Sequence, residues 1–100
     1  MRSERSWPSR KEIEVLKILQ RVGKPMIGMD IAKSSGGVID RAAVYVYLGR
    51  LRVKGFVTVK RLEGADYPGR PQPIYRINGL GRKAIAAADF MRSAASTMPA

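Results

Sequence analysis

The sequence has no cysteine and no histidine, and only 8 acidic residues stand against 19 lysines and arginines. The lack of cysteine and histidine excludes disulfide bonds, thiol nucleophiles, imidazole bases and zinc fingers. Glu12 and Glu14 lie two positions apart, so they cannot share one helix face as an acid/base pair. Because we also find no cluster of metal ligands, the sequence predicts a protein that is not an enzyme and binds no metal.

One glycine motif raises the question of a cofactor. Residues 79–84 read Gly-Leu-Gly-Arg-Lys-Ala and formally fit the dinucleotide-binding pattern. That fingerprint also needs a second parallel strand and an acidic residue about 20 positions further on, and neither follows. We interpret the glycines as the start of a helix and expect no cofactor.

Long hydrophobic runs are missing as well. The longest apolar run covers residues 42–48 and is followed closely by Arg50, whereas a helix that crosses a bilayer needs about 20 apolar residues. The first eight residues, Met-Arg-Ser-Glu-Arg-Ser-Trp-Pro, lack the apolar segment of a secretion signal. We therefore expect a cytoplasmic protein with no membrane partner.

Positive charge is the most prominent property that is present. The 100 residues carry a formal net charge of +11, and the 45% of hydrophobic residues are sufficient for one small core. The basic residues run from Arg2 to Arg92 and are interspersed with the patterned segments. Such an excess repels itself in a compact fold, so it indicates a polyanionic partner.

Caps and breakers divide the chain into elements. Ser9 and Glu12 match a capping box, and Gly23 ends the helix that they open. Asp40 is an N-cap, and Gly55 is the stop of the next long helix. The predicted order is a flexible arm over 1–8, helices over 9–22, 28–35 and 40–54, a short strand over 24–27, strands over 56–63 and 73–77, a helix over 79–93 and a frayed tail over 94–100.

This order predicts an α+β fold, a winged helix-turn-helix with a three-helix core, a two-stranded β-hairpin wing and an additional C-terminal helix. Residues 9–78 would form the domain, and residues 79–93 the added helix. A fold of this kind places one helix in the major groove of DNA and a loop beside it. We expect helix 40–54 to read the major groove, and the wing over 60–72 to contact the backbone or the minor groove.

Individual residues on these two elements suggest roles. Arg41 would contact guanine, Ala42 or Val46 would pack on a thymine methyl, and Arg50 would hold a phosphate. Tyr45 lies beside the buried side of the helix and is expected to be mainly structural. The remaining candidates are basic or polar: Lys60, Arg61, Arg70 and Gln72 in the wing, and Lys24 and Lys33 on the DNA backbone.

The C-terminal helix has a stripe of small and apolar residues that lets another helix approach closely. The stripe consists of Leu80, Ala84, Ala87, Ala88 and Met91. It would pack on helix 9–22 within the monomer or on a partner subunit, and we favour a homodimer that reads two half-sites. Two alternatives remain, a non-specific architectural or RNA-binding winged helix and a protein-interaction module.

At the level of motifs, the sequence resembles the PadR-like family of winged-helix transcriptional regulators. The resemblance covers residues 13–85 and rests on the order and spacing of several short pieces. These are Val44-Tyr-x-x-Leu48-x-Arg50-Leu51, Gly55-Phe-Val57, Gly69-Arg-Pro, Ile74-Tyr-Arg-Ile77 and Gly81-Arg-Lys-Ala-Ile85. It implies a dimeric repressor with Tyr45 and Arg50 in the recognition helix and Arg70 in the wing.

Three features depart from the family pattern. Asn78 stands where the family has threonine, which preserves the capping chemistry, and Arg52 stands where an acidic residue is usual. Gly36 and Gly37 lengthen the turn before the recognition helix. Family members that sense phenolics or drugs have a longer dimerisation helix, so the sequence leaves open whether a small-molecule effector binds here.

Overall fold

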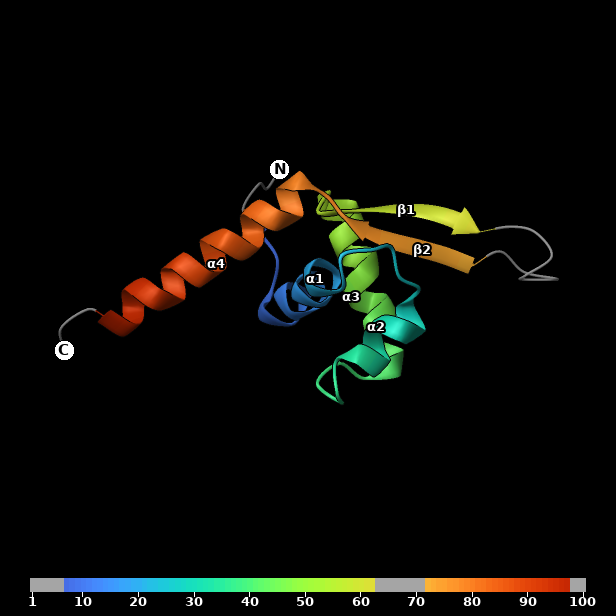
Figure 1. Ribbon diagram of the computed structural model, residues 1–100, viewed down its shortest axis with the longest axis horizontal. Coiled ribbons are helices and arrows are strands. Elements are labelled where there is room, and N and C mark those ends of the chain that lie inside the picture. Colours follow the sequence, from blue (N-terminus) through green and yellow to red (C-terminus); the bar gives the residue numbers. More distant parts are fainter. Residues whose placement is uncertain (1–6, 63–71, 98–100) are drawn as a thin grey trace.

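The computed structural model describes residues 7–62 and 72–97. Its elements are α1 (Arg10–Val22), α2 (Gly28–Ser34), α3 (Arg41–Lys54), β1 (Val57–Leu62), β2 (Gln72–Ile77) and α4 (Gly79–Thr97). Helices α1 to α3 pack together, the hairpin lies along them, and α4 extends away from the body (Figure 1). The predicted α+β winged helix-turn-helix is confirmed. Residues 1–6 of the predicted arm, 63–71 of the wing and 98–100 of the tail lie outside the described residues.

Local hydrogen bonds set both ends of α1. The Ser9 hydroxyl accepts from the Glu12 amide at 3.2 Å, and the Glu12 carboxylate accepts from the Ser9 amide at 3.1 Å, which confirms the capping box. Gly23 ends the helix with φ at +77°, in the left-handed region that glycine adopts most easily. Between these ends α1 contributes five apolar side chains to the core: Ile13, Val15, Leu16, Ile18 and Leu19.

The turn between α2 and α3 determines where the second long helix begins. Gly36 and Gly37 have φ of +65° and +97°, so this turn depends on glycine. The Ser35 hydroxyl donates to the Ala32 carbonyl at 2.6 Å and accepts from the Ile39 amide at 3.0 Å. Asp40 then caps α3, because its carboxylate accepts from the Ala42 amide at 3.1 Å. The cap predicted from the sequence is confirmed.

Strands β1 and β2 pair antiparallel, with Val57 opposite Ile77 and Val59 opposite Tyr75. These residues form the row that faces the core, and alternate positions lie on the outer face. The strand predicted over 24–27 is only a single bridge, in which Met26 exchanges two backbone hydrogen bonds with Tyr75. The pairing does not extend beyond this bridge, because Ile27 is already the N-cap of α2, which begins at Gly28.

Helix α4 is anchored at its first turns. The Asn78 side chain accepts from the Gly81 amide at 2.9 Å, which confirms the predicted cap. Gly81 is buried, and a Cβ there would lie 2.5 Å from the Phe56 carbonyl oxygen. Ala84 and Ile85 continue this anchor into the core, and the helix runs to Thr97 rather than ending near residue 93. None of the helices in the described part of the chain is long and apolar enough to cross a membrane.

Candidate nucleic-acid interface

Helix α3 has one buried side and one exposed side. Val44, Leu48 and Leu51 are completely buried, and their spacing of four and three residues keeps them on one side. The recognition-helix residues predicted from the sequence are all exposed: Arg41, Ala42, Tyr45, Val46 and Arg50. The structure therefore brings these five side chains to the part of α3 that faces solvent.

The middle of the exposed side is apolar, and its edges are basic. Ala42, Val46, Gly49 and Val53 follow one another at intervals of four, three and four residues, so they form a line along the helix. Val46 is 50% exposed and Val53 80% exposed. A shallow hollow of about 530 Å³ lies over this line, and its lining is Tyr45, Val46, Gly49, Arg50, Arg52, Val53 and Lys54.

Tyr45 both packs and remains accessible. Its ring lies so close to α2 that a Cβ on Gly28 would come within 2.5 Å of the Tyr45 Cε1 atom. Even so, Tyr45 is 45% exposed at the edge of the hollow. The pKa of Tyr75 is raised above its ordinary value of 10.0, mainly because this tyrosine is buried. The charge of Arg52 lowers this pKa, and Tyr45 raises it. Tyr45 therefore packs against α2 and leaves its outer edge accessible beside the hollow.

A buried ion pair holds the C-terminal end of α3. Glu12 is 1% exposed, and its Oε1 atom lies 2.7 Å from the Nζ atom of Lys54. The same ammonium group donates to the Trp7 carbonyl oxygen at 3.1 Å. The sequence marked Glu12 only as a capping residue, because its partner is 42 positions away. This pair joins the start of α1 to the end of α3.

The wing residues do not all share one face. Lys60 and Arg61 are both exposed but adjacent in β1, so their side chains lie on opposite faces of the hairpin. Arg61 continues the row of Val59, whereas Lys60 belongs to the outer face with Arg76. Gln72 pairs with Leu62 at the end of the ladder. Arg70 lies outside the described residues.

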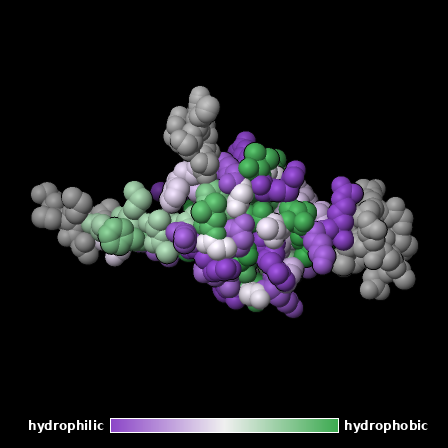
Figure 2. Space-filling view, turned by 90° about the horizontal axis from the view of Figure 1, so that it is seen from above, coloured by the Kyte–Doolittle hydropathy of each residue, from purple (hydrophilic) through white to green (hydrophobic). Residues whose placement is uncertain are grey.

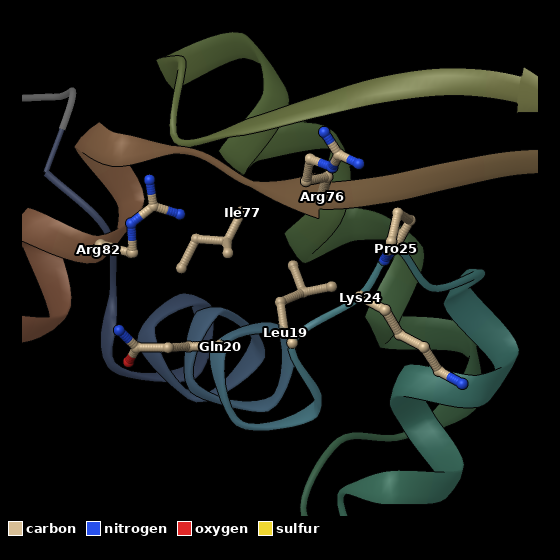
Figure 3. A pocket seen from close by; sticks show the side chains of 8 residues that line it. Leu19, Gln20, Lys24, Pro25, Arg76, Ile77 and Arg82 are labelled. Atoms are coloured by element: carbon tan, nitrogen blue, oxygen red, sulfur yellow. The ribbon is translucent and has the colours of Figure 1, made fainter.

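A second basic hollow lies between α1, β2 and the start of α4 (Figure 3). It has a volume of about 340 Å³, and its lining is Leu19, Gln20, Gly23, Lys24, Pro25, Arg76, Ile77 and Arg82. Three of these side chains are cationic, and none is acidic. Lys24 points away from the other lining side chains (Figure 3). Lys33, the other predicted backbone contact, is exposed in the last turn of α2.

Helix α4 presents the second exposed apolar surface (Figure 2). Leu80 is 50% exposed, Phe90 72% and Met91 63%. Of the five predicted dimerisation residues, Ala84 is buried in the monomer and Ala88 is packed against its core. Leu80, Ala87 and Met91 are at least partly accessible to another molecule.

The described residues contain no group of three or more histidine, cysteine, aspartate or glutamate side chains that could hold a metal ion.

Solved structures share this architecture. A PadR family transcription regulator from hypervirulent Clostridium difficile R20291 matches with a TM-score of 0.66 and 18% identity, covering 83% of this chain and 91% of that one. The fold is that of PadR-family transcription regulators. A PadR-like transcription factor from Bacteroides fragilis matches with a TM-score of 0.66 and 19% identity, over 83% and 82% of the two chains. The protein smu.1704 from Streptococcus mutans UA159 matches with a TM-score of 0.64 and 23% identity, over 90% and 85%.

The PadR-like resemblance found in the sequence is therefore confirmed at the level of the fold. No protein-family model and no curated protein sequence matches the chain.

Proposed function

We propose that this protein is a sequence-specific regulator of transcription that binds double-stranded DNA as a homodimer and acts as a repressor. The exposed side of α3 is the observation that carries the proposal, because it combines an apolar centre with basic edges. Arg41, Ala42 and Val46 read bases, and Arg50 holds a phosphate. Two of the predicted wing contacts, Lys60 and Arg61, lie on opposite faces of the hairpin. Arg61 is on the same face as Val59.

The charges on α3 support a polyanionic partner. Among the described residues, ion pairs engage Lys17, Lys54 and Arg92. Arg41, Arg50 and Arg52 are exposed, and within this part of the chain no carboxylate forms an ion pair with them. Contacts between such cations and DNA phosphates favour binding, because they release the counterions condensed on the DNA.

The exposed face of α4 supports dimerisation. Leu80, Ala87 and Met91 lie on one side of the helix, and Phe90 extends this surface. Two copies joined through α4 would present two α3 helices to two half-sites. A symmetric dimer of this kind would recognise an inverted repeat.

Selection from a random pool of duplex DNA, at fixed and roughly physiological salt, tests the proposal. We expect enrichment of an inverted repeat with half-sites about one helical turn apart. Retention without enrichment would instead indicate an architectural protein, and no retention would indicate a protein partner. A reporter driven by a promoter that contains the selected repeat then tests repression, and unchanged or increased transcription would contradict it.

The roles of Arg41 and Arg50 predict different defects. Arg50→Ala should weaken binding to every sequence and flatten the dependence of log K on log salt by about 0.9, which corresponds to one lost phosphate contact. Arg41→Ala should relax the preference at one base pair, since one bidentate contact to guanine discriminates by about 1–3 kcal/mol. Arg10→Ala at the exposed start of α1 removes the same charge away from α3 and α4 and controls for net charge. Equal losses on all sequences from Arg41→Ala and Arg50→Ala would contradict the assignment.

A further inference from the structure

The line of apolar residues on α3 remains largely uncovered by the described part of the chain. Val46 and Val53 are 50% and 80% exposed, although the opposite side of the same helix supplies the core. Single exposed aliphatic residues are common on protein surfaces. These two lie in one line with Ala42 and Gly49, and they share a hollow with arginine side chains. The surface is therefore apolar along its centre and cationic at its rim.

Gly49 is the most informative member of this line. A glycine inside a helix is unfavourable relative to alanine, so its presence needs a reason. Packing within the described part of the chain does not provide one, because a Cβ added at Gly49 would meet none of its atoms within 4 Å. The backbone does not provide one either, because Gly49 is not among the glycines with positive φ. The missing side chain instead opens the surface of α3 to a close approach from outside.

The charged side chains at the rim of the hollow limit which kind of partner can bind there. Arg50, Arg52 and Lys54 all line it, and none of the described lining residues is acidic. A purely apolar partner would leave Arg50 and Arg52 without counter-charges. The major groove of DNA meets both requirements, since phosphates border it and the C5-methyl groups of thymine project into it.

We infer that Val46, Gly49 and Val53 form a methyl-reading surface that selects thymine within the DNA site. In this arrangement Val46 contacts a thymine methyl, Gly49 allows the base edges to approach the helix, and Val53 closes the far wall of the hollow. The inference rests on the proposed function and adds the class of base that α3 prefers. Arg50 and Arg52 would face the phosphates on either side.

Replacement of thymine by deoxyuridine tests the inference directly, because it removes the methyl group and preserves base pairing. The probe is the duplex selected from the random pool, with each thymine replaced in turn, and affinity is measured at fixed salt. We expect about a fourfold loss at one or two positions of each half-site, which corresponds to one buried methyl-sized group. In Val46→Ala, the loss at the position that Val46 contacts should disappear.

Val38→Ala is the matched control, because Val38 is 52% exposed but lies outside α3. This variant should keep the full penalty at every uracil position. If uracil is tolerated everywhere while the duplex still binds, the inference is wrong and the proposed function stands. The inference also fails if the penalties in Val46→Ala equal those of the unchanged protein. If no duplex binds at all, the proposed function itself is wrong.

Gly49→Ala separates a binding role from a structural one. The added methyl enters open space, so the variant should be at least as stable as the original protein. Its affinity for the selected duplex should nevertheless fall several-fold, because the methyl occupies the hollow. Loss of stability, or unchanged affinity, would overturn the role assigned to Gly49.

Discussion

The exposed sides of α3 and α4 both carry large apolar residues, but their charged surroundings differ. On α3, Val46 and Val53 lie among arginines that form no ion pair within the described chain. On α4, Phe90 and Met91 follow Asp89, whose carboxylate lies 3.2 Å from Lys17 and 3.8 Å from Arg92. The Asp89 carboxylate therefore partly compensates the cations beside Phe90 and Met91, whereas within the described chain no carboxylate does so for the arginines of α3.

This difference shows that exposed apolar area alone does not identify a partner. An apolar surface whose neighbouring cations are partly paired suits a similar surface on a second copy of the chain. An apolar surface bordered by free cations needs a partner that supplies anions together with apolar groups. The two helices thus suggest two different partners for one small domain.

The largest expected effect comes from placing a charge on the α4 surface. Met91→Glu should separate the dimer, and affinity for the inverted repeat should then fall by about 10²–10⁴, the usual gain from linking two binding sites. Affinity for an isolated half-site should stay unchanged. Light scattering and binding to both duplexes measure the two effects.

Ser93→Glu is the control for this change. It adds the same charge at another exposed position, two residues further along the helix and therefore about 200° around it. This variant should remain dimeric. If Met91→Glu remains dimeric as well, the role of the α4 face is refuted.

The second effect concerns the attachment of α3. Lys54→Ala leaves the Glu12 carboxylate buried without its charged partner, which should cost about 2–4 kcal/mol of unfolding free energy. Lys17→Ala breaks a more exposed pair with Asp89 and should cost less than about 1 kcal/mol. Denaturant unfolding of both variants makes the comparison. Equal costs would show that the buried pair does not fix α3 more firmly than a surface pair does.

The third effect concerns the attachment of α4. Gly81→Ala places a Cβ 2.5 Å from the Phe56 carbonyl oxygen and 2.7 Å from the Ile77 side chain. We expect a loss of about 1–3 kcal/mol, typical of overpacking against groups that cannot easily move. Gly79→Ala meets its nearest atom at 3.9 Å and should be close to neutral. Thermal unfolding distinguishes the two variants, and equal stability would mean that the α4 junction can shift.

The parts of the fold that local chemistry controls could be predicted from the sequence. Ser9, Asp40 and Asn78 cap their helices with their own side chains, and Gly23 and Gly55 end helices in the left-handed region. Each of these signals acts within a few residues of the helix end. Their order was therefore enough to predict the elements and the winged-helix class.

Features that depend on tertiary contacts were not predictable in this way. The Glu12–Lys54 pair joins positions 42 residues apart, and no local pattern marks it. Ala84 belongs to a stripe that looks accessible in the sequence, yet it is buried because α4 starts against the core.

The orientation of the wing residues, in contrast, could have been predicted. Side chains alternate along a strand, so the adjacent Lys60 and Arg61 must lie on opposite faces of the hairpin.

The smallest expected effect is on stability at alkaline pH, which depends on Tyr75 in the core and on Arg52 at the edge of α3. Burial raises the pKa of this tyrosine above 10.0, so the folded state keeps a proton that the unfolded state releases. Stability from this group is fully present below pH 10 and decreases as the pH rises further, through the pKa of the folded state. Tyr75→Phe should lose less stability than the original protein between neutral and strongly alkaline pH. Arg52→Gln should steepen the decrease, because the Arg52 charge lowers this pKa. If stability depends on alkaline pH in the same way in all three proteins, the pKa of Tyr75 is not affected by Arg52.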